Sequence, residues 1–254
     1  MTEEKKIKIL VQARMGSTRL PGKVMKEVLG RPLLDFQIER LQQARLPHGI
    51  EILTTTESSD EPIVAFCQKK GLAYFRGSEE DVLDRYYQAA KEGKLDVIVR
   101  VTADCPLIDP DILDHIIAVY LAAFPTYDYV SNGLERTYPR GLDVEVFSFA
   151  ALEKSYREAK EPEEREHVTP YIYRHPELFH LKNISHSPAL DHYRWTVDTP
   201  EDFELIQLIL DRLYPLNPRF RLQDILALLD RHPDWNKINA HIEQKKLSPL
   251  NKKA

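Results

Sequence analysis

Short apolar runs alternate with amphipathic stretches through the first half of the chain. The runs at residues 7–13, 51–55, 72–75 and 96–102 are brief and rich in β-branched residues, which predicts buried strands. The stretches between them repeat apolar residues at helical spacing. This order predicts alternating strands and helices, and hence an α/β fold of Rossmann-like type. We expect a mixed, mostly parallel sheet with helices covering both faces.

Capping residues support four of these helices. The predicted starts are Pro32, Asp60, the capping-box sequence at residues 78–81 and Asp109 with Pro110, while Gly71 ends the second helix. In such a sheet, the active site lies beyond the carboxyl ends of the strands. The loops after Ala13, Thr102 and Val197 are therefore the candidate site.

Residues 128–197 are less regular than the first half. They predict short strands at residues 128–131, 142–147, 178–184 and 193–197, with helices from Ser148 and near Glu164. Thr199 then caps an amphipathic helix that runs to about Tyr214, and residues 217–254 predict two further helices and a polar tail of open role. No linker interrupts the sequence. We expect one domain over residues 1–254, in which residues 128–197 form an inserted lobe for the substrate and for contact within a homodimer.

Composition narrows the possible partners. The 254 residues include 35 basic and 40 acidic side chains, so the net charge of −5 gives no general attraction for nucleic acid. No apolar run reaches the roughly 18 residues that span a membrane, and the N-terminus does not read as a secretory signal. The two cysteines, Cys67 and Cys105, suit a reducing cytoplasm. Any anion must therefore be bound by a local cluster of cations.

A basic loop after the first strand provides such a cluster. Residues 12–26, QARMGSTRLPGKVMK, contain Arg14, Arg19, Lys23 and Lys26 and no acidic residue. With Gly16 and Ser17 among them, backbone N–H groups can turn toward a phosphate that the cations neutralise. The sequence is neither a P-loop nor a Gly-x-Gly-x-x-Gly loop. The alternative is a solvated basic turn.

Acidic residues follow two predicted strands and lie within a third. Asp104 and Asp198 each come directly after a strand, where they can hold Mg²⁺ against a triphosphate, although both can equally serve as turn or cap residues. Asp143 and Glu145 alternate on one face of a predicted strand, which suits either sugar hydroxyls or solvent. Glu166 and His167 are polar enough to belong to a sugar site, or they form an exposed helical turn.

Six ordered segments resemble the sugar cytidylyltransferases, and most of all the branch of spore coat polysaccharide biosynthesis protein F. The segments are QARMGSTRLPGKVM, GSEEDVLDRYYQAA, VRVTADCPLIDPDILD, GLDVEVFS, REHVTPYIY and WTVDTPEDFELI, within residues 7 to 215. This group is related to the acylneuraminate and 3-deoxy-manno-octulosonate cytidylyltransferases. The resemblance implies a nucleotide-diphospho-sugar transferase fold. It also implies Mg²⁺-dependent transfer of CMP from CTP to a sugar, of acidic or nonulosonate type, for surface polysaccharides.

The same resemblance implies roles for individual residues. The implied triphosphate ligands are Arg14, Gly16, Ser17, Arg19 and Lys23; the base and ribose lie near Gly77, Ser78 and Asp81; and the metal ligands are Asp104 and Asp198. Arg19, Lys23 and the two aspartates form the catalytic set. One departure concerns Cys105, because octulosonate enzymes usually have a glutamate at this position. This argues against octulosonate as the sugar.

Other functions also fit these patterns. A uridylyl- or guanylyltransferase acting on a sugar 1-phosphate shares the loop and the fold, and base preference cannot be read from the sequence. A glycosyltransferase of the same sheet type would want Asp-x-Asp at the metal strand, whereas the chain has Thr102-Ala103-Asp104. A non-catalytic sugar-nucleotide sensor is the third alternative, and the retained Lys23, Asp104 and Asp198 argue against it.

Overall fold

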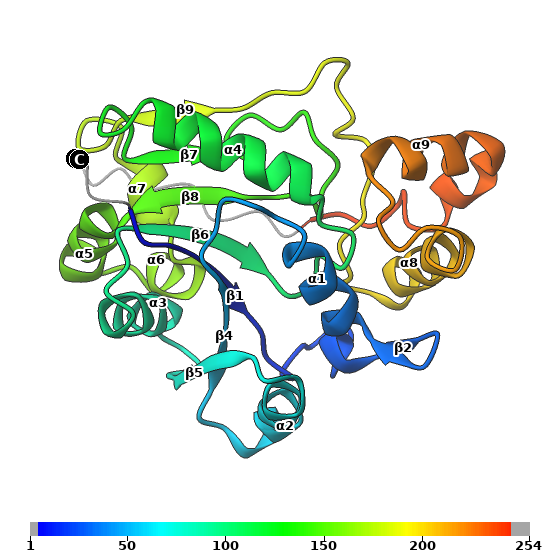
Figure 1. The fold of residues 1–254 in the computed structure, drawn as a ribbon, viewed down its shortest axis with the longest axis horizontal. Coiled ribbons are helices and arrows are strands. Elements are labelled where there is room, and N and C mark those ends of the chain that lie inside the picture. The colour runs from blue at the N-terminus through cyan, green and yellow to red at the C-terminus, as the bar shows by residue number, and fades with distance from the viewer. Residues whose placement is uncertain (1–4, 245–254) are drawn as a thin grey trace.

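A single mixed sheet organises the chain in the computed structural model, which describes residues 5–244 (Figure 1). Its order is β5-β4-β1-β6-β8-β7-β9. The strands are β1 Ile7–Gln12, β4 Ile50–Thr55, β5 Ala73–Gly77, β6 Val97–Thr102, β7 Tyr129–Ser131, β8 Glu145–Ser148 and β9 Leu181–Asn183. Strands β5, β4, β1 and β6 run parallel, whereas β8 is antiparallel to β6 and to β7. The predicted mostly parallel sheet is confirmed.

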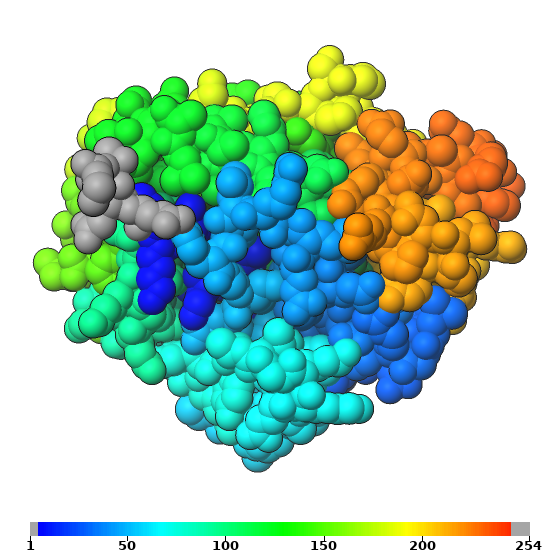
Figure 2. All heavy atoms as spheres, in the orientation of Figure 1, coloured from blue at the N-terminus to red at the C-terminus, as the bar shows by residue number. Residues whose placement is uncertain are grey.

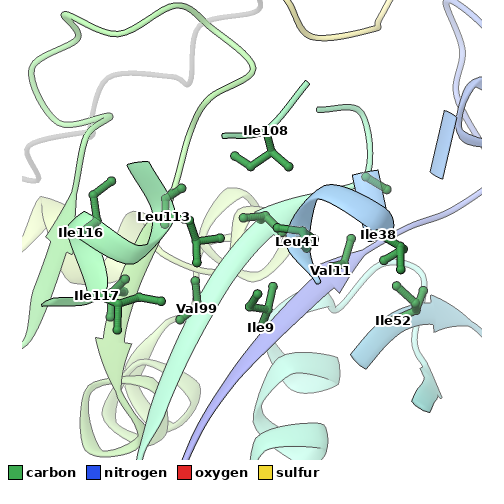
Figure 3. Close-up of a cluster of buried hydrophobic side chains, with 14 of the residues drawn as sticks. Ile9, Val11, Ile38, Leu41, Ile52, Val99, Ile108, Leu113, Ile116 and Ile117 are labelled. Carbon is green, nitrogen blue, oxygen red and sulfur yellow. The ribbon is translucent and has the colours of Figure 1, made fainter. Parts of the chain in front are cut away.

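Helices cover both faces of this sheet. One face carries α1 Leu33–Leu41, α2 Glu61–Lys70 and α4 Pro110–Ala122, and the other carries α3 Val82–Glu92, α5 Phe149–Glu158 and α7 Pro170–Arg174. Side chains alternate along each strand, so Ile9 and Val11 face α1 and α4 while Leu10 faces α3. Figure 3 shows the first of these layers, where strand residues meet Ile38 of α1 and Ile116 of α4.

A third apolar cluster holds the C-terminal part of the described chain. Helices α8 Pro200–Leu213 and α9 Leu222–Arg231 pack on Trp195 and on residues near the basic loop, such as Leu20 and Phe36. In Figure 2 these helices form an orange bulge beside the blue N-terminal segment. This packing brings the region around residue 198 to the basic loop. No helix among residues 5–244 is long and apolar enough to cross a membrane.

Residues 128–197 extend the same sheet. Their strands β7, β8 and β9 follow β6 in the sheet order, and α6 Pro162–His167 contacts α3 on the second face. The remaining short elements are the pair β2 Glu27–Val28 and β3 Arg31–Pro32, and the 3₁₀ turns η1 Lys23–Met25, η2 Ser58–Asp60 and η3 Pro233–Lys237. The two helices predicted after residue 217 correspond to α9 and η3, while the polar tail lies outside the described residues.

Two predicted strands differ from the structure. Residues 193–197 form no strand, only one bridge between Arg140 and Arg194, because their apolar side chains belong to the third cluster rather than to the sheet. Strand β8 begins at Glu145 rather than at residue 142. The Asn132 side chain explains the late start, since it donates to the Leu142 carbonyl and accepts from the Val144 N–H.

The helix caps follow the sequence closely, with one exception. Asp109 caps α4, and Thr199 with Asp202 forms a capping box on α8. The predicted capping box at residues 78–81 is wrong, because α3 begins only at Val82 with Asp81 as its N-cap. Ser78 instead accepts a hydrogen bond from the Asp81 N–H, in the turn before the helix.

Candidate active site

A cavity of about 950 Å³ lies at the carboxyl ends of β1 and β6. It is the crevice in which sheets of this type bind their ligands. The sequence-predicted residues that line it are Arg14, Gly16, Ser17, Arg19, Lys23, Asp104, Asp143, Glu145, Glu166, His167 and Asp198. Gly77, Ser78 and Asp81 do not line the cavity, and Asp81 is paired with Arg165 at 2.5 Å.

One left-handed glycine and two hydrogen bonds from backbone N–H groups shape the basic loop. Gly22 adopts a left-handed conformation at φ 67°, and its N–H donates to the Met15 carbonyl at 3.0 Å, which closes the loop. The Met15 N–H in turn donates to Asp60 Oδ1 at 2.7 Å. Lys23 follows the glycine at the start of η1, so the closed loop directs its ammonium group into the cavity.

Lys23 joins the two strand-end aspartates. Its Nζ lies 2.9 Å from Asp104 Oδ2 and 2.7 Å from Asp198 Oδ1. The second oxygen of Asp198 is paired with Arg19 at 3.1 Å and with Arg194 at 2.8 Å. Lys23 and Asp198, 175 positions apart in sequence, are therefore in direct contact, and the two aspartates that were predicted to follow strands meet around the Lys23 ammonium group.

The local electrostatics keep this cluster charged. Burial alone would lower the pKa of Lys23, but Asp104 and Asp198 outweigh it and raise that pKa above its usual value. Burial would likewise raise the pKa of Asp104, whereas Lys23 and the hydroxyl of Thr102, at 2.5 Å, hold it below the usual range. Near neutral pH, Lys23 is therefore an ammonium group and Asp104 a carboxylate.

Close packing of two loops fixes Asp198. The Val197 N–H donates to the Asp104 carbonyl at 2.8 Å, which ties the two aspartate-bearing segments together. Gly141 packs against the backbone on the other side, where an added Cβ would lie 2.6 Å from the Trp195 carbonyl carbon. Its φ of 103° also favours glycine, so this residue allows its own loop to approach the backbone of residues 195–198.

The two acidic residues predicted for a sugar site, Asp143 and Glu145, already have partners in the protein. Asp143 precedes β8, so it does not share a strand face with Glu145 as predicted; it pairs with Arg136 at 2.5 Å and accepts from the Gly141 N–H. Glu145 accepts from Arg100, and from the hydroxyls of Tyr129 and Thr169 at 2.6 Å each. These partners make Glu145 part of the cavity floor.

The remaining predicted residues differ in their surroundings. Glu166 is exposed, and His167 lies beside it at the end of α6. Burial lowers the pKa of His167, so its imidazole is neutral near pH 7. Lys26 lies outside the cavity lining, with its ammonium 5.3 Å from the Phe203 ring centre. Cys105 is buried, and burial raises its thiol pKa well above the usual value, which fits a packed residue rather than a nucleophile.

Sequence reasoning missed several charged residues at this site, among them three arginines and one aspartate. Arg85, Arg136 and Arg140 line the cavity, and Asp60 anchors the basic loop to β4. The signal for Asp60 is its place after the polar run that follows β4. The three arginines carry no comparable signal, because the sequence does not show which arginines the fold brings to the cavity.

The carboxylate oxygens around Lys23 can also be compared with the ligands that a metal ion requires. Asp104 and Asp198 each turn one oxygen toward the same point, where the lysine ammonium lies between them. Two carboxylates completed by phosphate oxygens are the ligands that Mg²⁺ prefers. Among the described residues no group of three His, Cys, Asp or Glu side chains gathers for a metal, so the pair fits an ion held jointly with a nucleotide.

Comparison with known proteins identifies the family. The family model described as "Cytidylyltransferase" matches residues 8–228. The spore coat polysaccharide biosynthesis protein SpsF of Bacillus subtilis is 35% identical over 90% of this chain and 95% of its own. This chain belongs to the cytidylyltransferase family. An uncharacterized protein of Methanocaldococcus jannaschii is 39% identical over 93% of this chain and 95% of its own length.

A solved member of the cytidylyltransferases has the same fold. The cytidylyltransferase from Leptospira borgpetersenii superposes with a TM-score of 0.88 at 35% identity, and covers 95% of this chain and all of its own. Membership of the cytidylyltransferase family confirms the resemblance drawn from the six segments. It also favours cytidylyl transfer over the uridylyl, guanylyl and glycosyl transfer alternatives.

Asp60 anchors the basic loop to β4, and its contribution to the stability of this cytidylyltransferase can be measured. Its buried carboxylate accepts from the Met15 N–H, from the Thr55 N–H and from the hydroxyls of Thr54 and Thr55. Asp60→Asn places an amide donor among these donors, so we expect the free energy of unfolding to fall by about 2–4 kcal/mol. Urea denaturation near pH 7 measures it, with the exposed Asp234→Asn as control.

The pH dependence of this loss has a definite sign. Burial would raise the pKa of Asp60, but the four hydrogen bonds hold it below its unfolded value near 4. The stabilisation is therefore complete above about pH 5 and is lost as the pH falls through the folded pKa. The difference between wild type and Asp60→Asn should shrink at about pH 3. An equal difference at both pH values would contradict this assignment.

Proposed function

We propose that this protein transfers CMP from CTP to a hydroxyl group of an acidic sugar, of nonulosonate type, and releases pyrophosphate during surface polysaccharide synthesis. The observation that carries the proposal is the meeting of Lys23, Asp104 and Asp198 in the cavity beside the basic loop. Membership of the family supports cytidylyl transfer, and this cluster supports the cavity as the site of that reaction.

The basic loop is suited to the triphosphate. Arg14, Arg19 and Lys23 line one side of the cavity, and Gly16 and Ser17 lie between them. In-line attack by a sugar oxygen on the α-phosphorus displaces pyrophosphate, whose growing charge needs cations rather than a covalent partner. We assign the main contact with the leaving pyrophosphate to Lys23, because its side chain is the least exposed of the three and is positioned by Asp104 and Asp198.

Mg²⁺ completes the proposed site. Asp104 and Asp198 would hold the ion, each with the oxygen that faces Lys23, and Lys23 would then pair with a phosphate oxygen. When bound, the ion neutralises phosphate charge and favours the ionised form of the attacking hydroxyl. Arg19 and Arg194 remain on the other oxygen of Asp198 and keep its carboxylate oriented.

Two arginines in the sugar lobe support an acidic acceptor. Arg140 lines the cavity, and its guanidinium has no hydrogen-bond or ion-pair partner among residues 5–244. Burial and the neighbouring Arg136 lower the pKa of Arg140, which reflects this uncompensated charge. Arg136 has a buried Nη1 without a partner, although its Nη2 pairs with Asp143. A carboxylate on the sugar would satisfy these donors bidentately.

A pyrophosphate-release screen tests the proposal. The wild-type protein would be offered CTP and Mg²⁺ with acidic sugars, neutral sugars and sugar phosphates as acceptors, and then UTP or GTP with each acceptor. We expect release with CTP and at least one sugar acid. Release only with UTP or GTP and a sugar 1-phosphate would contradict the proposal, and favour the nucleotidyltransferase alternative.

Arg140 allows a sharper test of the acceptor. Arg140→Gln should raise the KM for the sugar acid by about tenfold or more, because a charge-assisted hydrogen bond is lost, while the KM for CTP stays nearly unchanged. Steady-state kinetics with each substrate varied measure this. The exposed Arg157→Gln on α5 is the matched control. An equal rise in both KM values would place Arg140 at the nucleotide instead.

A further inference from the structure

Arg85 is a buried cation without a partner on the cavity wall. It lies on α3, is 2% exposed and lines the same cavity as Lys23. Its Nε and Nη1 atoms are buried and have no hydrogen-bond partner among the described residues. Burying a charge without compensation is costly, so such a group persists where a ligand repays that cost.

The nearest carboxylates do not neutralise Arg85. Asp60 contributes favourable charge, but its oxygens are engaged by Met15, Thr54 and Thr55. Glu79 is paired with Arg14 at 3.4 Å. Burial is accordingly the largest influence on Arg85 and lowers its pKa. The guanidinium therefore has N–H groups for which residues 5–244 provide no acceptor.

The surroundings of Arg85 favour a neutral ligand with acceptor atoms. Val82 lies one turn before it on α3 and, with Ala13, gives the cavity an apolar surface on which a flat ring can rest. Arg14 and Glu79 both lie near enough to influence Arg85, but their opposite charges pair with each other, so they leave no net charge at Arg85 that calls for an anionic ligand.

We propose that Arg85 donates hydrogen bonds to the O2 and N3 acceptor edge of the cytosine ring, and thereby selects CTP over UTP. This assignment rests on the proposed function, because it takes CTP as the nucleotide. Uracil carries a hydrogen on N3, so it would set a donor against the donors of Arg85. A two-point contact of this kind distinguishes bases by roughly 10- to 100-fold.

Arg85→Met tests the assignment, because it keeps the length of the stem and removes every donor. We expect the Kd for CTP to rise by roughly 10- to 100-fold and the preference for CTP over UTP to fall toward one. The melting temperature of the nucleotide-free protein should stay level or rise, because an unpaired buried charge is removed. Isothermal titration with CTP, UTP and inorganic tripolyphosphate, together with a thermal melt, gives both readouts without requiring turnover.

The matched control is Arg40→Met. Arg40 is also buried and leaves Nη1 and Nη2 without partners, but it lies outside the cavity lining, stacks on Phe220 and donates to the Ile108 carbonyl. Its replacement should lower the melting temperature and leave the CTP to UTP ratio unchanged. Arg85→Lys, which keeps the charge but not the two-point geometry, should also lose the preference for CTP.

The outcomes separate this inference from the proposed function. Equal weakening of CTP, UTP and tripolyphosphate in Arg85→Met would assign Arg85 to the phosphates and overturn the base contact. A lower melting temperature with unchanged preference would make Arg85 structural. Wild-type protein that binds CTP no better than UTP would instead count against the proposed function, before any variant is compared.

Discussion

Replacing Lys23 with alanine is expected to lower kcat/KM with CTP by about a hundredfold or more. Removing one preorganised charge contact to the transition state costs this much in other enzymes. Lys23 lies between Asp104 and Asp198, so the variant also leaves two carboxylates facing each other, which should disfavour a triphosphate further. Steady-state pyrophosphate release with varied CTP measures the effect.

Lys26→Ala is the control for this prediction. Lys26 belongs to the same basic stretch of sequence, but it lies outside the cavity lining and over the Phe203 ring. It should keep nearly wild-type kinetics. Equal losses in both variants would show that the general charge of the loop matters rather than the position of Lys23, and unchanged kinetics in Lys23→Ala would contradict the site.

The second large effect concerns the aspartate pair. Asp104→Asn and Asp198→Asn should each abolish measurable turnover at ordinary Mg²⁺, because each removes one of the two carboxylates proposed to share the ion. The double variant should lose little more than either single variant, since both substitutions remove the same ion. Kinetics over a range of Mg²⁺ concentrations, with Asp234→Asn as control, test this. An active double variant would contradict the shared site.

The two variants should differ in stability. Asp198 is mostly buried and pairs with Lys23, Arg19 and Arg194, so Asp198→Asn removes the carboxylate partner of Arg19 and one of the two carboxylate partners of both Lys23 and Arg194. We expect a loss of about 1–3 kcal/mol in the free energy of unfolding, and a smaller loss for Asp104→Asn. The sequence alone could not show this difference, because the contacts of Asp198 with Lys23 and Arg19 join residues that are distant in sequence.

Much of the sheet and its site could be predicted because the information is local. Apolar runs marked β1, β4 and β6, and each ended where a polar loop began, which placed Asp104 at the cavity. Segment 193–197 misled the prediction because an apolar stretch can be buried against helices as well as within a sheet. Asp198 still reached the site, since the loop around Gly141 packs against that segment.

The charged partners could not be predicted because they depend on contacts distant in sequence. The alternating pattern predicts that the Glu145 carboxylate is free, yet it accepts hydrogen bonds from Arg100, Tyr129 and Thr169. Arg85 reads as an ordinary helix residue, and only its burial without a carboxylate sets it apart. Such properties belong to pairs of residues brought together by folding.

The fate of the α-phosphate tests the central claim most directly. Wild-type protein would be incubated with Mg²⁺, a sugar acid from the screen and CTP that is isotopically labelled at the α-phosphate. We predict that the label moves into a CMP-linked sugar, in equal amount to the pyrophosphate released. Label that stays on CDP while inorganic phosphate appears, or that forms free CMP with no sugar conjugate, would contradict cytidylyl transfer by this site.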